Sequence, residues 1–377
     1  MVRKLKVAAI GCGSWIQAVH LPAISQNESA SLIACADTDS SRGRAVQQKF
    51  GIPKFYESYE EMLGKESPDL VLVAIPHALH APATKQALES GANVVVEKPM
   101  ATTLEDAIGL AQLARSKGKF VVVGHEMRLQ RNVQAAKRMV VEGKLGRPYF
   151  ARALYLRRRG VPATATFLVK ELAHGGSVFD IGSHSVDAAL FMLGFPKPVS
   201  VTGRTHSIFS TRKEVRYGYR TRPDFYPGPV EVEDVGFGIV EFEGGLSAYL
   251  ETCWAGYIME DTQQIAIEGD QGGVHVEGNS LHVIGAEEDY NTLTELAFSG
   301  QPGSVQYKEF YGLVLDAVQK GETEAPFPLC TVDQGVYGVA VMTALYASAE
   351  EHGQHRIGLP TWLRPQHQPE PPAATPP

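Results

Sequence analysis

The chain has 377 residues, of which 44% are hydrophobic and 20% charged, and it carries a formal net charge of −7. Because a single hydrophobic core rarely extends over so many residues, we expect two domains. The slightly acidic balance, with basic residues dispersed apart from Arg157 to Arg159, argues against nucleic acid or a membrane surface as a partner.

The first forty residues follow the order strand, glycine turn, helix, strand and acid. Residues 5–10 and 32–36 are apolar runs typical of buried strands, and the second run ends at Asp37. Gly11 permits a tight turn, and Gly13 lets the backbone approach a pyrophosphate whose charge lies at the start of the next helix. Asp37 can accept hydrogen bonds from the ribose hydroxyls of an adenosine. The pattern predicts a dinucleotide site; the alternative is a turn that binds nothing.

Strands and helices alternate over the rest of residues 1–124. The nearly continuous apolar run 69–75 is typical of a parallel strand covered on both faces. The alternation predicts an α/β fold, with an N-terminal Rossmann domain built on a doubly wound parallel sheet. The expected helices are 40–50, 59–63, 81–90 and 103–117, and the further strands are 69–75, 93–96 and 120–123.

Ligands of such sheets bind where the strands end, so the residues that follow each strand are the candidate cofactor contacts. Lys98 follows a strand and precedes a proline that fixes its turn, and it can exchange a proton with a substrate oxygen. The alternative for Lys98 is a lysine that caps the sheet edge, and we expect His20 to be structural. The candidate cofactor contacts are Gly11, Gly13, Ser14, Trp15, Ile16, Asp37, Ile75, Pro76, His77, His80, Glu97, Lys98 and His125.

Beyond residue 124 the pattern changes to short strands joined by glycine turns. This indicates a mostly antiparallel sheet, and we expect an α+β substrate and oligomerisation domain over residues 125–357. Seven of the last nineteen residues are proline, so residues 358–377 are expected to be a disordered tail or an arm on another subunit. The expected helices are 132–142, 178–193, 307–320 and 333–350, and the strands are 149–156, 199–202, 236–242, 246–252, 264–267, 273–276 and 281–283.

The expected helix 178–193 carries Asp180, His184 and Asp187 at positions i, i+4 and i+7. A carboxylate one helical turn from an imidazole can fix its tautomer and raise its basicity, as a proton-transfer group near neutral pH requires. The alternative is a buried structural pair, and the ligand set is too small to favour a metal. The candidate substrate contacts are Lys98, Arg157, Arg158, Lys170, His174, Asp180 and His184, although a solvated basic edge would equally explain the arginines.

The four cysteines show no CxxC spacing and are typical of a reducing compartment. No apolar run reaches about 18 residues, and the first strand begins at residue 5, which leaves no room for a signal peptide. We therefore expect a cytoplasmic protein.

Five motifs follow one another between residue 5 and about residue 195. They are GCGSWIQAVHLPA, the acid Asp37, VAIPHALHAPATKQALESGANVVVEKP, VVVGHEMR and GGSVFDIGSHSVD. In this order they resemble the Gfo/Idh/MocA family of oxidoreductases, which includes glucose-fructose oxidoreductase and inositol dehydrogenase. The resemblance implies NAD(P)-dependent chemistry at a sugar or cyclitol carbon, and a C-terminal domain whose open sheet builds dimers or tetramers.

By motif, the resemblance assigns Lys98 as the catalytic lysine, and Asp180 and His184 as the acid and the histidine that face the nicotinamide. Ile16 and Ser177 depart from the small residue and the third glycine that are usual in the family. We expect NAD rather than NADP, a sugar or polyol substrate and a homodimer or homotetramer. The alternatives are an NAD-dependent glycosidase that oxidises its substrate transiently, and a non-catalytic Rossmann sensor.

Overall fold

The computed structural model describes residues 3–209, 212, 225–298 and 303–363. These divide into two compact units, Met1–Leu129 with Gln301–Val336, and Gln130–Gly300 with Tyr337–Pro377. Most of the expected proline-rich tail, residues 364–377, lies outside the described residues.

The first unit contains a seven-stranded sheet in the order β15-β6-β5-β4-β1-β2-β3. All neighbouring strands are parallel except β15 and β6, which are antiparallel. The strand order reverses between β1 and β4, where Rossmann sheets bind dinucleotides. The strands are β1 (Leu5–Ile10), β2 (Ala30–Ala36), β3 (Lys54–Tyr56), β4 (Leu70–Val73), β5 (Asn93–Val96), β6 (Val121–Val123) and β15 (Cys330–Thr331).

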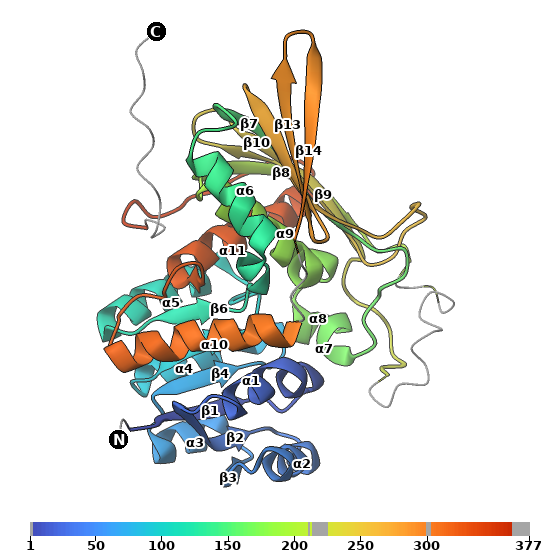
Figure 1. The fold of residues 1–377 in the computed structure, drawn as a ribbon. Helices are drawn as coiled ribbons and strands as arrows, with labels where there is room; N and C mark the ends of the chain where they lie inside the picture. The colour runs from blue at the N-terminus through green and yellow to red at the C-terminus, as the bar shows by residue number, and fades with distance from the viewer. Residues whose placement is uncertain (1–2, 210–211, 213–224, 299–302, 364–377) are drawn as a thin grey trace. The chain divides into compact units, whose positions relative to one another are not determined.

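Helices cover both faces of this sheet, which confirms the predicted doubly wound Rossmann fold (Figure 1). The boundaries of α5 have the expected local causes, since Thr103 Oγ1 accepts a hydrogen bond from Asp106 N and Gly118 ends the helix in the left-handed conformation. The helices are η1 (Ile16–His20), α1 (Leu21–Ser25), α2 (Ser40–Phe50), α3 (Tyr59–Glu66), η2 (His77–Leu79), α4 (His80–Glu89), α5 (Leu104–Lys117), η3 (Glu126–Leu129) and α10 (Gly303–Lys320).

The first unit also contains residues 301–336, although the sequence pattern predicts them in the second domain, 125–357. The reason is the apolar face of α10, where Tyr307, Phe310 and Tyr311 are buried in the same hydrophobic cluster as β1 and α1. Figure 1 shows α10, in orange, beside the strands of this unit. This packing joins α10 to β1 and α1, which lie about 300 residues earlier in the chain, so local sequence patterns do not predict it.

The second unit contains a nine-stranded sheet in the order β14-β13-β12-β11-β7-β10-β9-β8-β16. It is antiparallel except where β7 and β10 run parallel, which confirms the predicted mostly antiparallel sheet. The strands are β7 (Pro148–Leu156), β8 (Pro198–His206), β9 (Val235–Phe242), β10 (Ser247–Cys253), β11 (Thr262–Gly269), β12 (Gly272–Glu277), β13 (Ser280–Glu287), β14 (Tyr290–Ala297) and β16 (Gln354–Arg356).

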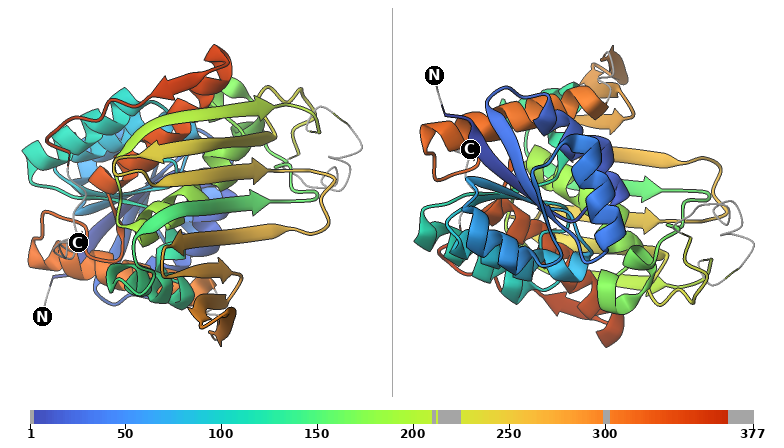
Figure 2. Two further views of the ribbon diagram at one scale, coloured as in Figure 1. Left: turned by 90° about the horizontal axis from the view of Figure 1, so that it is seen from above. Right: turned by 90° about the horizontal axis from the view of Figure 1, so that it is seen from below.

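Helices pack on one face of this sheet, and Figure 2 (left) shows its other face without a covering helix among the described elements. In β9, buried residues such as Val240 and Phe242 alternate with partly exposed ones, as one-sided cover requires. The helices are α6 (Arg131–Val141), α7 (Ala165–Leu168), α8 (Lys170–Ala173), η4 (Val178–Gly182), α9 (Ser183–Leu193) and α11 (Val332–Glu351), the last beginning in the first unit.

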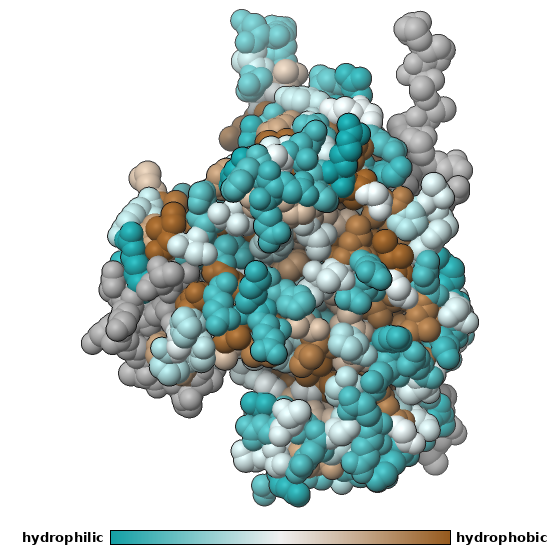
Figure 3. Space-filling view, turned by 180° about the vertical axis from the view of Figure 1, so that it is seen from behind, coloured by the Kyte–Doolittle hydropathy of each residue, from teal (hydrophilic) through white to brown (hydrophobic). Residues whose placement is uncertain are grey.

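On the face shown in Figure 3, hydrophilic side chains are interspersed with hydrophobic ones. Among the described residues, no helix is long and apolar enough to cross a bilayer.

Candidate active site

The glycine turn after β1 has the shape that a pyrophosphate needs. Gly11 has a φ of +96°, and a Cβ at this position would lie 2.2 Å from the carbonyl oxygen of Ala74, so only glycine fits. A Cβ on Gly13 would meet nothing within 4 Å, which leaves its backbone open to a ligand. The turn therefore fits a dinucleotide, and it leads into η1 through Ser14 and Trp15.

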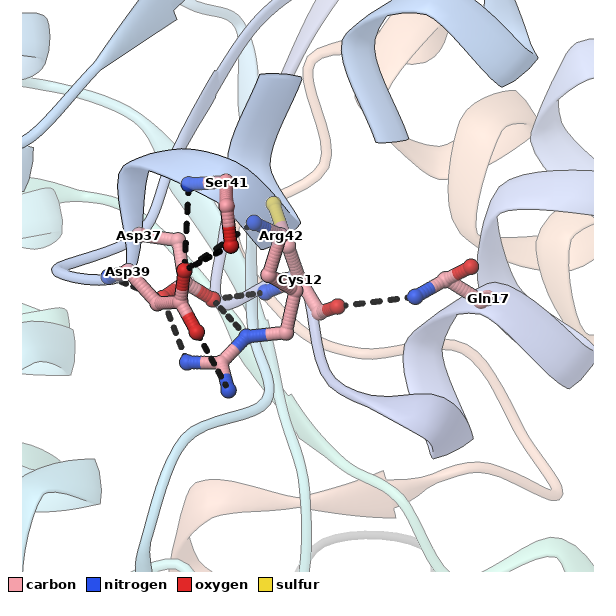
Figure 4. Close-up of polar contacts among 6 residues, drawn as sticks. All are labelled: Cys12, Gln17, Asp37, Asp39, Ser41 and Arg42. Carbon is pink, nitrogen blue, oxygen red and sulfur yellow. Dashed lines mark hydrogen bonds and ion pairs between the residues drawn. The ribbon is translucent and has the colours of Figure 1, made fainter. Parts of the chain in front are cut away.

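Asp37 lies at the end of β2 with its carboxylate already paired (Figure 4). Its Oδ2 accepts hydrogen bonds from Cys12 N at 2.8 Å and Arg42 Nε at 3.0 Å, and its Oδ1 accepts from Asp39 N at 2.8 Å and Arg42 Nη2 at 2.6 Å. The hydrogen bonds to Asp37 raise the pKa of the Arg42 guanidinium. Four donors occupy this carboxylate, so a ribose hydroxyl that binds here has to displace Arg42.

Glu97 is a buried carboxylate at the end of β5, next to Lys98. It accepts hydrogen bonds from His20 Nε2 at 2.8 Å and Trp15 Nε1 at 3.2 Å, while His20 Nδ1 lies 2.6 Å from the Tyr311 hydroxyl. Burial opposes ionisation of Glu97, yet the hydrogen bond and charge of His20, with the charge of Lys98, lower its pKa to about 2. His20 thus holds the anion beside the candidate catalytic lysine, in agreement with its expected structural role.

Of the two histidines beyond β4, His80 is held between two backbone carbonyls. His80 places Nδ1 2.7 Å from Pro99 O and Nε2 2.7 Å from Ile75 O, and burial lowers its pKa. Its ring lies 5.8 Å from that of His77, which is also buried. His80 therefore joins the end of β4, where Ile75 and Pro76 lie, to the turn after Lys98, and it is not free to carry protons.

The buried Glu97 anion should make folding of the wild type sensitive to acid. Because its pKa is lower in the folded protein, ionised Glu97 stabilises the fold above about pH 4.5, and this contribution, on the order of 3 kcal/mol, is lost as the pH falls towards about 2. Glu97→Gln should lose stability at neutral pH and show a smaller further loss on acidification. Thermal unfolding from pH 7 to pH 3, with the exposed Glu105→Gln as control, measures this. Parallel pH curves for wild type and Glu97→Gln would contradict it.

The helix that carries the candidate acid and histidine begins with a π turn. Residues 178–182 form η4 and residues 183–193 form α9. The prediction of one α-helix with Asp180, His184 and Asp187 on the same face is therefore wrong for Asp180, which lies in the π turn. A π turn holds one more residue than an α-helical turn, which changes the direction of Asp180 relative to His184. Tight packing at this turn leaves no room for a side chain at Gly182, where a Cβ would lie 2.6 Å from Thr252 Cγ2.

Asp180 contacts the buried ring of Trp254, and His184 lies near the half-buried ring of Tyr155. Trp254 Nε1 donates a hydrogen bond to Asp180 Oδ2 at 2.9 Å, and the His184 ring lies 6.4 Å from that of Tyr155. Arg157 stacks on Tyr155 at 4.9 Å and donates from Nη2 to its hydroxyl at 2.9 Å. Arg157 and His184 therefore contact the same ring.

The other predicted substrate contacts of this unit lie at its surface. Arg158, Lys170 and His174 are exposed, and Lys170 N donates to Glu231 Oε2 at 2.9 Å. Lys98 and the buried His125 belong to the first unit, whereas Asp180 and His184 belong to the second. The catalytic and substrate-binding roles of these residues remain predictions.

A buried acid that none of the sequence motifs contains holds the start of the π turn. Glu233 accepts hydrogen bonds from Gly176 N at 2.8 Å, Val178 N at 3.0 Å and the Tyr346 hydroxyl at 2.9 Å. Burial raises the pKa of Glu233 despite these donors. It is one of three acids among residues 231–234, and their position just before a strand is the only signal that could have singled it out.

The open glycine turn on a Rossmann sheet, followed by a second α+β unit, is typical of a nicotinamide-dependent oxidoreductase. Residues 5–125 match the oxidoreductase family with an NAD-binding Rossmann fold, and residues 133–275 match the GFO/IDH/MocA C-terminal domain. The chain belongs to the Gfo/Idh/MocA family, as its motifs predicted, and is an NAD(P)-dependent enzyme acting on CH–OH groups.

Its relatives include D-glucoside 3-dehydrogenase of Escherichia coli K12, 31% identical over 348 residues, which are 92% of this chain and 95% of the relative. D-xylose 1-dehydrogenase (NADP(+)) 2 of Haloferax volcanii is 26% identical over 92% of this chain and 96% of the relative. A structure of levoglucosan dehydrogenase with NADH and levoglucosan has a TM-score of 0.81 at 18% identity, covering 95% of this chain and 100% of the other, and supports the fold alone. These likenesses do not separate NAD from NADP.

Proposed function

We propose that the enzyme is a dehydrogenase of neutral sugars or glycosides, which transfers hydride between a ring secondary hydroxyl and NAD. The main support is the buried carboxylate of Asp180, which accepts a hydrogen bond from Trp254. Asp180 lies in η4, and His184 lies in α9, which directly continues η4. Such a pair suits removal of a hydroxyl proton. The name of the relative D-glucoside 3-dehydrogenase points to the same substrate class.

In this mechanism the bound nicotinamide supplies the hydride acceptor, and the glycine turn and Asp37 hold the cofactor. His184 or Lys98 takes the hydroxyl proton of the substrate, and Asp180 orients the imidazole. Glu97, held by His20 and Trp15, provides a fixed negative charge beside Lys98.

The proposal is tested by following net NADH formation with methyl glucosides, free aldoses and inositols as substrates. A neutral sugar, glycoside or polyol that yields stoichiometric NADH and a keto product is the expected result. Cleavage of the glycosidic bond without net NADH, by enzyme that retains its cofactor through purification, would instead identify a glycosidase.

We expect neutral sugars to be preferred over phosphorylated ones. Arg157 is held against Tyr155 and Arg158 is exposed, so these two do not form a buried pair of the kind that grips a phosphate. The measurement compares kcat/KM for a matched neutral and phosphorylated sugar at fixed NAD. A preference of about tenfold or more for the phosphorylated sugar, or about 1.4 kcal/mol, that disappears in Arg158→Ala would overturn this prediction.

A further inference from the structure

Trp254 follows β10, and its indole N–H reaches the carboxylate of Asp180. The residue has no exposed surface, and its Nε1 lies 2.9 Å from Asp180 Oδ2. Its backbone N donates to Asp234 O at 2.8 Å, which fixes the chain from which the ring extends. The ring packs in a hydrophobic cluster that contains Val161, Leu168, Ala173, Ile181, Val232 and Ala255.

In the contact between Trp254 and Asp180, the indole is the donor and the carboxylate is the acceptor. An indole N–H only donates, so it favours Asp180 as an acceptor and therefore as the charged carboxylate. It carries no charge of its own, so it does not neutralise the acid as an arginine would. Packing alone would not require an N–H here, since a phenyl ring would also fill an apolar cluster.

We propose that Trp254 is a positioning residue for proton transfer. It holds the Asp180 carboxylate charged and in the orientation in which it orients the His184 imidazole. This inference rests on the proposed function, since it assumes that Asp180 assists His184. It predicts that the indole N–H acts on turnover only through the Asp180 carboxylate.

The test is a double-mutant cycle on kcat. Trp254→Phe removes the N–H and keeps most of the apolar ring, and should lower kcat by about 10- to 100-fold with little change in the dissociation constant of NAD. In an Asp180→Ala background the same change should lower kcat by less than about twofold, because the carboxylate through which it acts is gone. Equal losses in both backgrounds would show that Trp254 only supports the fold, and would overturn the proposal.

The test includes a control variant at Tyr249 and a second replacement of Trp254. Tyr249→Phe removes another aromatic donor to a carboxylate in β10, the 3.0 Å bond to Glu251, and should leave kcat near wild type. If Trp254→Phe does not fold, benzothienylalanine placed at position 254 keeps the bicyclic shape without the N–H. It should give the same loss of kcat, and wild-type kcat with it would refute the proposal.

Failure of this inference and failure of the proposed function are distinguishable. If Asp180→Ala itself turns over at the wild-type rate, the assignment of Asp180 fails and the positioning role of Trp254 fails with it. If Asp180→Ala is slow and Trp254→Phe is not, only the role of Trp254 is refuted.

Discussion

His184→Ala and Lys98→Met are each expected to lower kcat by about 10²- to 10⁴-fold, the contribution typical of a general acid or base. Both groups are proposed to exchange a proton with the substrate hydroxyl, while the glycine turn and Asp37 hold the cofactor. The dissociation constant of NAD should therefore stay near the wild-type value. Steady-state kinetics with the best neutral substrate and a separate NAD titration measure the two quantities.

Lys117→Met, an exposed lysine at the end of α5, serves as the control and should leave kcat unchanged. Near-normal turnover in Lys98→Met would make that lysine a cap of the sheet edge. For His184→Ala, a large fall in melting temperature with unchanged turnover of the folded fraction would favour the buried structural pair.

The glycine turn and the acid at the end of β2 could be predicted from the sequence because their geometry is local. Gly11, Gly13 and Asp37 lie within 27 residues of one another, and strand, turn and helix fix their positions. The pattern did not show that Arg42 occupies the Asp37 carboxylate, because that depends on a rotamer.

The surroundings of Asp180 and His184 were predicted less completely, because the residues that hold this helix come from distant segments. Trp254 meets Asp180 across 74 positions of the chain, and Glu233 reaches Gly176 across 57. The spacing of Asp180 and His184 predicted one regular helix, whereas the chain forms a π turn at residues 178–182. A π turn leaves the apolar pattern of a helix almost unchanged, so periodicity alone does not reveal it.

The same dependence on distant partners explains the placement of α10. Its spacing predicted a helix from Tyr307 onward, and the structure contains one at Gly303–Lys320. Which unit it joins was decided by the packing of its aromatic face on the Rossmann core, about 300 residues away in the chain.

Asp37→Ala is expected to narrow the proposed preference for NAD over NADP by about 100-fold. The wild-type carboxylate would repel the additional phosphate of NADP, and like charges in contact cost several kcal/mol. The substitution also releases Arg42, whose Nη2 lies 2.6 Å from Asp37 Oδ1, to pair with that phosphate. Titration of both cofactors by quenching of tryptophan fluorescence gives the two dissociation constants.

Arg42→Ala should act in the opposite direction and widen the preference for NAD by about tenfold, since it frees the carboxylate for the ribose and removes the cation that offsets phosphate repulsion. Arg44→Ala is the matched control, because Arg44 lies on the same helix but stacks on Phe55, 5.5 Å from its ring centroid. It should change neither constant. A clear NADP preference in the wild type, lost in Arg42→Ala, would show instead that Arg42 leaves Asp37 to bind the phosphate.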